Sequence, residues 1–179
     1  MPQSNVALVG FMCAGKSTVG RRLAHQLGKA FVETDTVVEK EAAMSIAHIF
    51  ETRGEDVFRD MESHAIREAC TGHNAVIACG GGAVLRSDNV ERLRATSTVI
   101  YLAVSEEVVL QRLGPAPEVR PLLAGPARRE RVSDLMQYRL PFYERAAHIT
   151  IDTTSLQMSE VVETVLQSLS EHESTDKSK

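Results

Sequence analysis

The chain has 179 residues, 43% of them hydrophobic, and a formal net charge of −4. That length fits one compact α/β domain with a sizeable core, and the acidic balance argues against a nucleic-acid partner, which usually meets a basic protein face. No segment approaches the ~20 apolar residues that span a bilayer, and the N-terminus carries no basic leader, so we expect a cytoplasmic protein with no membrane partner.

The first predicted element is a phosphate-binding loop between a strand and a helix. Residues 6–9 are an apolar run typical of a buried strand, and residues 19–27 have helical spacing that ends at Gly28. Between them stands a complete G-x-x-x-x-G-K-[ST] motif, in which loop amides and a helix N-terminus converge on one anionic group. Lys16 supplies charge to the β- and γ-phosphates, and Ser17 offers a hydroxyl to Mg²⁺. The motif predicts a nucleoside triphosphate site made by Cys13, Ala14, Gly15, Lys16, Ser17 and Thr18.

The second predicted strand, residues 30–32, runs into Glu33-Thr34-Asp35. In parallel sheets ligands gather at the carboxyl ends of strands. An extended segment would point both acids the same way, one toward a metal and one toward a substrate hydroxyl. Alternatively the acids begin the next helix, with Asp35 as its N-cap, because acids in a first turn favour the macrodipole. The local sequence leaves both interpretations open.

An interrupted helical pattern over residues 36–70 predicts a substrate compartment beside the phosphates. Ser45 can cap a short helix that Gly54 ends, and a longer helix follows. In the longer helix Arg59 stands three residues before Glu62. Taken alone, that spacing favours a surface ion pair worth roughly 0.2–0.5 kcal/mol.

Three consecutive glycines, Gly80, Gly81 and Gly82, follow the third predicted strand at residues 75–79. Such a run has a large backbone-entropy cost, so something must approach the main chain too closely for side chains. A ligand is favoured over a tight strand-to-helix turn, which needs only one or two glycines.

A loop without periodicity occupies residues 114–126. It follows the fourth predicted strand, residues 98–102, and a helix that Ser105 caps. Loops this long inside a compact domain tend to be lids. Arg120 in this loop can swing over a transferring phosphate, and the alternative is an exposed arginine with no role.

The last third of the chain predicts a helix from residue 127 to about residue 138, a fifth strand at 148–152 and a closing helix at 156–169. The first of these helices should stop before Pro141. Residues 170–179 have nothing to bury and should be disordered. The remaining residues, 1–169, should form a single domain.

Together these motifs resemble shikimate kinase. The phosphate loop, Glu-Thr-Asp, G-E-x-x-F-R-x-x-E, the three glycines, R-P-L-L and Tyr-Arg-x-Pro follow in order within about residues 5–154. The resemblance implies a three-layer P-loop kinase fold with a five-stranded parallel sheet, a helical substrate-binding insertion and a lid. It also implies a monomer that uses ATP and Mg²⁺ to phosphorylate the 3-hydroxyl of shikimate in aromatic amino-acid biosynthesis.

The resemblance also implies roles for the acceptor side. Asp35 would hold the ring hydroxyls and orient, or accept the proton of, the attacking one. Arg59 and Arg139 would clamp the shikimate carboxylate, with Gly81 adding a backbone amide from the glycine run. Two planar guanidinium groups can bind one carboxylate in a bidentate mode that lysine cannot match.

On the donor side, Arg120 would be the lid arginine on the transferring phosphate. Three positions depart from the family pattern. Glu33 replaces the usual first aspartate and would contact the waters of Mg²⁺ with altered geometry. Cys13 stands where the loop often has glycine, at a position that can need φ > 0. Leu156 replaces an arginine near the adenine, so we expect Arg112 to stack on the base.

Two other functions remain open. A P-loop kinase of a different polyol or sugar acid would keep the loop and the lid without needing Arg59 and Arg139 together. A non-catalytic nucleotide-dependent regulator would keep Lys16 and Ser17 but has no reason to retain Asp35 or the glycine run.

We expect alkylation of Cys13 to block ATP binding, because the thiol lies within the phosphate-binding loop. Nucleotide affinity measured on modified and unmodified protein tests this. Modified protein that keeps its affinity would contradict it.

Overall fold

The computed structural model describes residues 5–114 and 127–176. Its strands form one parallel sheet in the order β2-β3-β1-β4-β5, which confirms the predicted five-stranded α/β architecture. The strands are β1 (Asn5–Val9), β2 (Ala30–Glu33), β3 (Ala75–Ala78), β4 (Ser97–Ala103) and β5 (Ile149–Asp152).

The central strand, β1, is buried along its whole length, as expected for an apolar strand with a neighbour on each side and helices on both faces. Its first residue, Asn5, is also buried. The Asn5 side chain accepts a hydrogen bond from the Ala75 amide and donates one to the Gly72 carbonyl, both at 2.9 Å. These bonds tie the start of β1 to the turn before β3.

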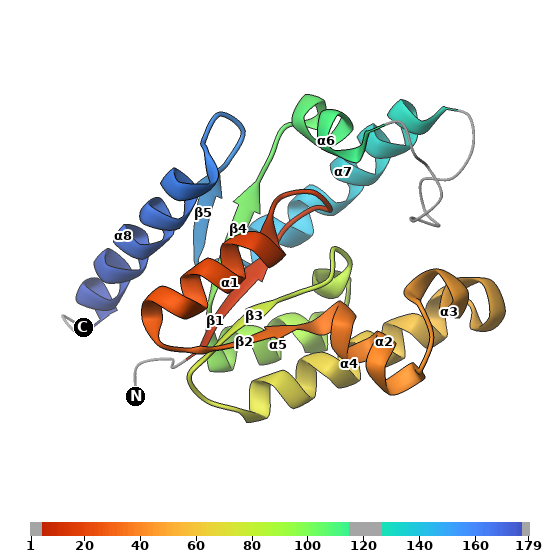
Figure 1. The fold of residues 1–179 in the computed structure, drawn as a ribbon, viewed down its shortest axis with the longest axis horizontal. Coiled ribbons are helices and arrows are strands. Elements are labelled where there is room, and N and C mark those ends of the chain that lie inside the picture. Colours follow the sequence, from red (N-terminus) through yellow and green to blue (C-terminus); the bar gives the residue numbers. More distant parts are fainter. Residues whose placement is uncertain (1–4, 115–126, 177–179) are drawn as a thin grey trace.

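Helices cover both faces of the sheet and give the fold three layers (Figure 1). Helices α1 and α8 pack together on one face, and α4, α5 and α7 cover the other. Among the residues described, no helix combines the length and the apolar character needed to cross a bilayer. The helices are α1 (Lys16–Leu27), α2 (Thr34–Ala42), α3 (Ile46–Arg53), α4 (Glu55–Thr71), α5 (Ser87–Thr96), α6 (Glu106–Leu113), α7 (Arg128–Ala146) and α8 (Met158–Asp176), with a 3₁₀ turn η1 (Ala83–Leu85).

Helices α2, α3 and α4 occupy the predicted helical insertion and have a hydrophobic cluster of their own. Ser45 caps α3 by accepting a hydrogen bond from the His48 amide, and Gly54 ends it, both as predicted. The buried members of the cluster are Val38, Ile49, Phe58 and Ala65, and none of them belongs to the main core around the sheet.

The predicted end of a helix before Pro141 is wrong, because α7 runs to Ala146 with the proline inside it. A proline within a helix removes one hydrogen bond and costs about 3 kcal/mol. Burial offsets that cost, since Arg139, Tyr143 and Ala146 of α7 are all buried. Tertiary packing therefore overrides the local signal.

The predicted disorder of residues 170–179 is also wrong as far as residue 176, where α8 ends. Leu169 is buried, and the Gln167 side chain donates to the Glu171 carboxylate at 2.9 Å across one helical turn. A buried anchor with polar pairs beyond it extends the helix past the last apolar residue. Residues 177–179 lie outside the described residues.

His148 joins β5 to β4 through its ring as well as its backbone. Its amide donates to the Val99 carbonyl at 2.8 Å, and its Nδ1 accepts from the Val99 amide at 2.9 Å. Burial, with Arg94 and His172 nearby, lowers the pKa of His148 below its ordinary 6.5. The fold therefore holds a neutral ring.

We expect this ring to make the fold less stable in acid. The unfolded chain takes up a proton at His148 near pH 6.5, before the folded chain does, so the free energy of unfolding falls as pH falls through and below that value. His148→Asn keeps an acceptor there but does not titrate. Urea unfolding between about pH 7 and pH 5 should show wild type losing stability relative to His148→Asn. Parallel losses in the two proteins would contradict the assignment.

Candidate functional site

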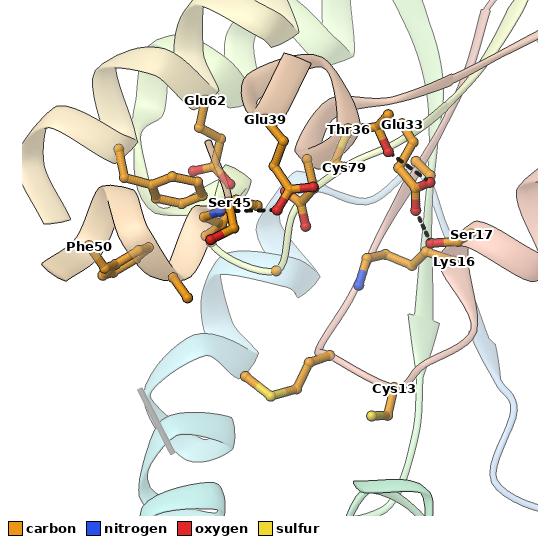
Figure 2. Close-up of a pocket in the computed structure, with 18 of the residues that line it drawn as sticks. Cys13, Lys16, Ser17, Glu33, Thr36, Glu39, Ser45, Phe50, Glu62 and Cys79 are labelled. Carbon is orange, nitrogen blue, oxygen red and sulfur yellow. Dashed lines mark hydrogen bonds between the residues drawn. The ribbon is translucent and has the colours of Figure 1, made fainter. Parts of the chain in front are cut away.

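A cavity of about 560 Å³ opens where the carboxyl ends of β1, β2 and β3 meet. Its walls come from the phosphate-binding loop, the beginning of α2, helices α3, α4 and α7, and the glycine run. Figure 2 shows Lys16 and Ser17 on one side of this cavity and Phe50 and Glu62 on the other. The predicted site residues that line it are Cys13, Gly15, Lys16, Ser17, Thr18, Glu33, Asp35, Arg59, Gly81, Gly82 and Arg139.

The phosphate-binding loop has the expected strand-loop-helix geometry. Gly15 takes the left-handed conformation, φ 91°, at the N-cap position of α1. Cys13 also has a positive φ, 63°, at the position where the sequence predicted one and where glycine would be less strained. The Lys16 ammonium donates to the carbonyls of Gly10 and Phe11 at 2.8 and 2.9 Å. The loop thus holds its lysine against its own backbone at the cavity wall.

Glu33 lies at the N-cap position of α2, although its side chain does not cap that helix. It instead accepts hydrogen bonds from the Ser17 hydroxyl and from Thr36 at 3.3 Å (Figure 2). Arg21 also donates to the Glu33 carboxylate, at 2.8 Å. The Ser17 hydroxyl and the Glu33 carboxylate form a pair of oxygen ligands of the kind that Mg²⁺ prefers. Magnesium usually takes few protein ligands beside phosphate oxygens and waters, so this pair fits the ion.

Asp35 lies in the first turn of α2. The acids therefore begin a helix, as one interpretation held, but Glu33 and not Asp35 takes the N-cap position, and the extended arrangement of the acid pair is wrong. Burial raises the pKa of Asp35 above its ordinary 3.8, although Lys16 opposes that shift. Its Oδ1 is buried without a hydrogen-bond partner in the described part of the chain. The carboxylate is available to a ligand hydroxyl.

Arg59 and Glu62 form the predicted i,i+3 ion pair, but inside the protein and not on its surface. The Arg59 side chain is 9% exposed and that of Glu62 is 1% exposed. The guanidinium donates to Glu62 at 2.7 Å and to Glu55 at 2.9 Å. Because a buried charge left alone is costly, the pair holds the guanidinium in one orientation at the cavity wall.

The glycine run provides the space into which these charged groups pack. A methyl group on Gly80 would overlap the free oxygens of Asp35 and Glu62, and one on Gly82 would overlap the Arg59 guanidinium. Neither glycine has a positive φ, so space and not backbone conformation requires them. Side chains of the site therefore make the close approach that the glycine run predicted, and the contact with a ligand stays a prediction.

Arg139 reaches the same run from α7. Its Nη1 donates to the Gly81 carbonyl at 3.2 Å, and its Nε is buried with no hydrogen-bond partner among the described residues. Arg59 and Arg139, eighty positions apart in sequence, therefore flank one glycine turn. Both side chains also line the same cavity, and their role as a clamp on one carboxylate stays a prediction.

Two predicted site residues, Arg112 and Arg120, are not among the described residues that line the cavity. Arg112 is exposed and donates to the Cys13 carbonyl at 2.8 Å, so it lies beside the phosphate-binding loop. Arg120 and residues 115–126 of the predicted lid lie outside the described residues.

The sequence did not single out two residues that hold the glycine turn. Thr34 is buried, and its hydroxyl accepts from the Gly80 amide at 3.0 Å. Tyr143 donates to the Gly81 carbonyl at 2.5 Å. Thr34 lies within the Glu33-Thr34-Asp35 segment, so its position was a signal that it could contact the site. For Tyr143 the sequence offered no comparable signal.

The chain is similar to known shikimate kinases over nearly its whole length. A family model described as shikimate kinase matches residues 12–170. A shikimate kinase from Symbiobacterium thermophilum is 44% identical, over 93% of this chain and 97% of its own, and one from Dehalococcoides mccartyi is 40% identical over 97% of each. The structure of shikimate kinase from Acinetobacter baumannii in complex with shikimate superposes with a TM-score of 0.91 at 36% identity, covering 96% of this chain and 95% of the other.

We expect Gly80→Ala to destabilise the protein by about 1–3 kcal/mol, because the added methyl displaces two buried carboxylates. Gly81→Ala is the matched control, since a methyl there meets nothing closer than 3.5 Å. Urea unfolding of the two variants measures the difference. Equal losses would show that the run is not limited by space at Gly80.

Proposed function

We propose that this chain, which belongs to the shikimate kinase family, transfers the γ-phosphate of ATP to the 3-hydroxyl of shikimate. The observation that carries the proposal is the shared cavity, in which a phosphate-binding loop lies together with two guanidinium groups and the Asp35 carboxylate, whose Oδ1 has no hydrogen-bond partner among the described residues. Phosphoryl transfer depends on positioning and charge neutralisation more than on covalent help.

On the acceptor side, Arg59 and Arg139 bind the shikimate carboxylate. Arg59 is already oriented by Glu55 and Glu62, so little freedom is lost when the ligand arrives. Asp35 holds the ring hydroxyls and orients, or takes the proton from, the attacking one. Its unpaired Oδ1 and its raised pKa support this role, because a more basic carboxylate is a better proton acceptor.

On the donor side, the amides of the loop and the Lys16 ammonium bind the phosphates of ATP. Ser17 and Glu33 would hold Mg²⁺, and the ion when bound would neutralise charge on the phosphates. Arg112 stacks on the adenine, a role that its contact with the loop supports. Arg120 contributes charge from the lid.

We also propose that the enzyme acts as a cytoplasmic monomer. The side chains proposed above that lie within the described residues all come from one chain, which supports a site that needs no second subunit. A kinase that acts on a different polyol would not require two guanidinium groups at one turn. A non-catalytic regulator would not require Asp35. Each alternative therefore leaves observed features of the site without a role.

Two substitutions separate the roles on the acceptor side. Asp35→Asn should lower kcat by about 10²- to 10⁴-fold, because it removes the group that accepts or orients the proton. Arg139→Ala should raise the KM for shikimate by about 10- to 100-fold, because one charged hydrogen-bonding partner of the carboxylate is lost. ADP release coupled to a second enzyme measures both, with a panel of hydroxy acids as competing acceptors.

Arg131→Ala, at an exposed position on the same helix, is the control and should change neither constant. ATP affinity should persist in all three variants. Turnover of another hydroxy acid in preference to shikimate, or full activity in Asp35→Asn, would refute the proposal.

A further inference from the structure

Helix α7 provides two donors to one backbone carbonyl of the glycine turn. The Tyr143 hydroxyl donates to the Gly81 oxygen at 2.5 Å, and Arg139 Nη1 donates to the same oxygen at 3.2 Å. The two donors are one helical turn apart, so they lie on the same face of α7. The tyrosine makes the shorter of the two bonds.

Tyr143 is itself held in place by the sheet. It is 1% exposed, and its ring stacks on that of Tyr101 in β4 with centroids 5.1 Å apart and planes 16° apart. Burial raises the pKa of the Tyr143 hydroxyl, although Arg139 opposes the shift. The group therefore stays protonated and donates to the carbonyl. It forms a rigid link between β4 and the turn.

Fixing the Gly81 carbonyl also fixes the next amide. The peptide bond is planar and trans, so the Gly82 N–H points away from the side on which Tyr143 holds the oxygen. At the other end of the turn the Gly80 amide donates to Thr34. Within the described part of the chain no hydrogen bond uses the Gly81 or Gly82 amide, and both glycines line the cavity.

We propose that Tyr143 is a positioning residue for the acceptor carboxylate, acting through the Gly81–Gly82 peptide. By holding the Gly81 oxygen it fixes the direction of the following amide, which belongs to a residue that lines the cavity. Because the Tyr143 hydroxyl also bonds that oxygen, the Arg139 guanidinium can give up its own bond to the oxygen and bind the ligand. The assignment rests on the proposed function and adds a residue that does not itself touch the substrate.

Tyr143→Phe tests the assignment, because it removes the hydroxyl and keeps the stacked ring. The KM for shikimate should rise by about three- to tenfold, the effect of one hydrogen bond, while kcat and the KM for ATP should stay within about twofold of wild type. Since the chain has no tryptophan, direct binding of shikimate is followed by calorimetry and should weaken to the same extent.

Tyr101→Phe is the matched control, since it also removes a buried phenolic hydroxyl from the same stack. Its KM for shikimate should not change. Thr34→Val is a second variant that releases the Gly80 end of the turn, and it should raise the KM for shikimate even if Tyr143→Phe fails to fold.

Three results would overturn the assignment: shikimate KM values within twofold of wild type in the folded variants at Tyr143 and Thr34, an equal rise in Tyr101→Phe, or a parallel rise in the KM for ATP. An active wild type with these results refutes the assignment alone. A wild type that does not phosphorylate shikimate refutes the proposed function, and the assignment with it.

Discussion

The whole site depends on the burial of charge around three residues that have no side chains. Gly80 and Gly82 allow carboxylates from α2 and α4 and a guanidinium from α4 to approach the backbone at the end of β3. The ion pair between Arg59 and Glu62 makes this burial possible, because each charge has a partner at hydrogen-bonding distance. Without that pairing the acceptor half of the cavity would contain isolated charges in a medium of low polarity.

The hydrogen-bonding capacity around the turn is not fully used among the described residues, which leaves groups that a ligand can satisfy. Asp35 and Glu62 each keep a buried oxygen without a partner in the described chain, and burial raises the pKa of both. Arg139 likewise keeps a buried N–H unused. Acceptors and a donor that no described residue satisfies are what a small molecule with hydroxyls and a carboxylate would complete.

Much of this arrangement could be predicted from the sequence because its signals are local. The phosphate-binding loop, the ends of α1 and α3 and the five strands depend on neighbouring residues, and all were found where expected. The convergence of Arg59 and Arg139 was predicted through the family resemblance, since spacing alone favoured a surface pair for Arg59. Only the fold shows that this pair is buried.

The errors have a common physical origin. Pro141 and the residues after Leu169 carry strong local signals for helix ends, and tertiary packing in α7 and polar pairs in α8 outweigh them. The conformation of the chain after β2 was ambiguous for a different reason, because an acidic tripeptide suits both an extended strand end and a helix start. The role of Tyr143 could not be predicted, since a phenol two residues after the Tyr-Arg-x-Pro motif shows its partner, the Gly81 carbonyl, only in three dimensions.

The separate hydrophobic cluster of α2, α3 and α4 has a consequence for how such a protein can diversify. Its buried residues are not shared with the core that supports the phosphate-binding loop. Substitutions among these four residues can therefore alter the wall of the cavity without removing a side chain from the main core, to which α4 contributes two other residues, Ile66 and Cys70.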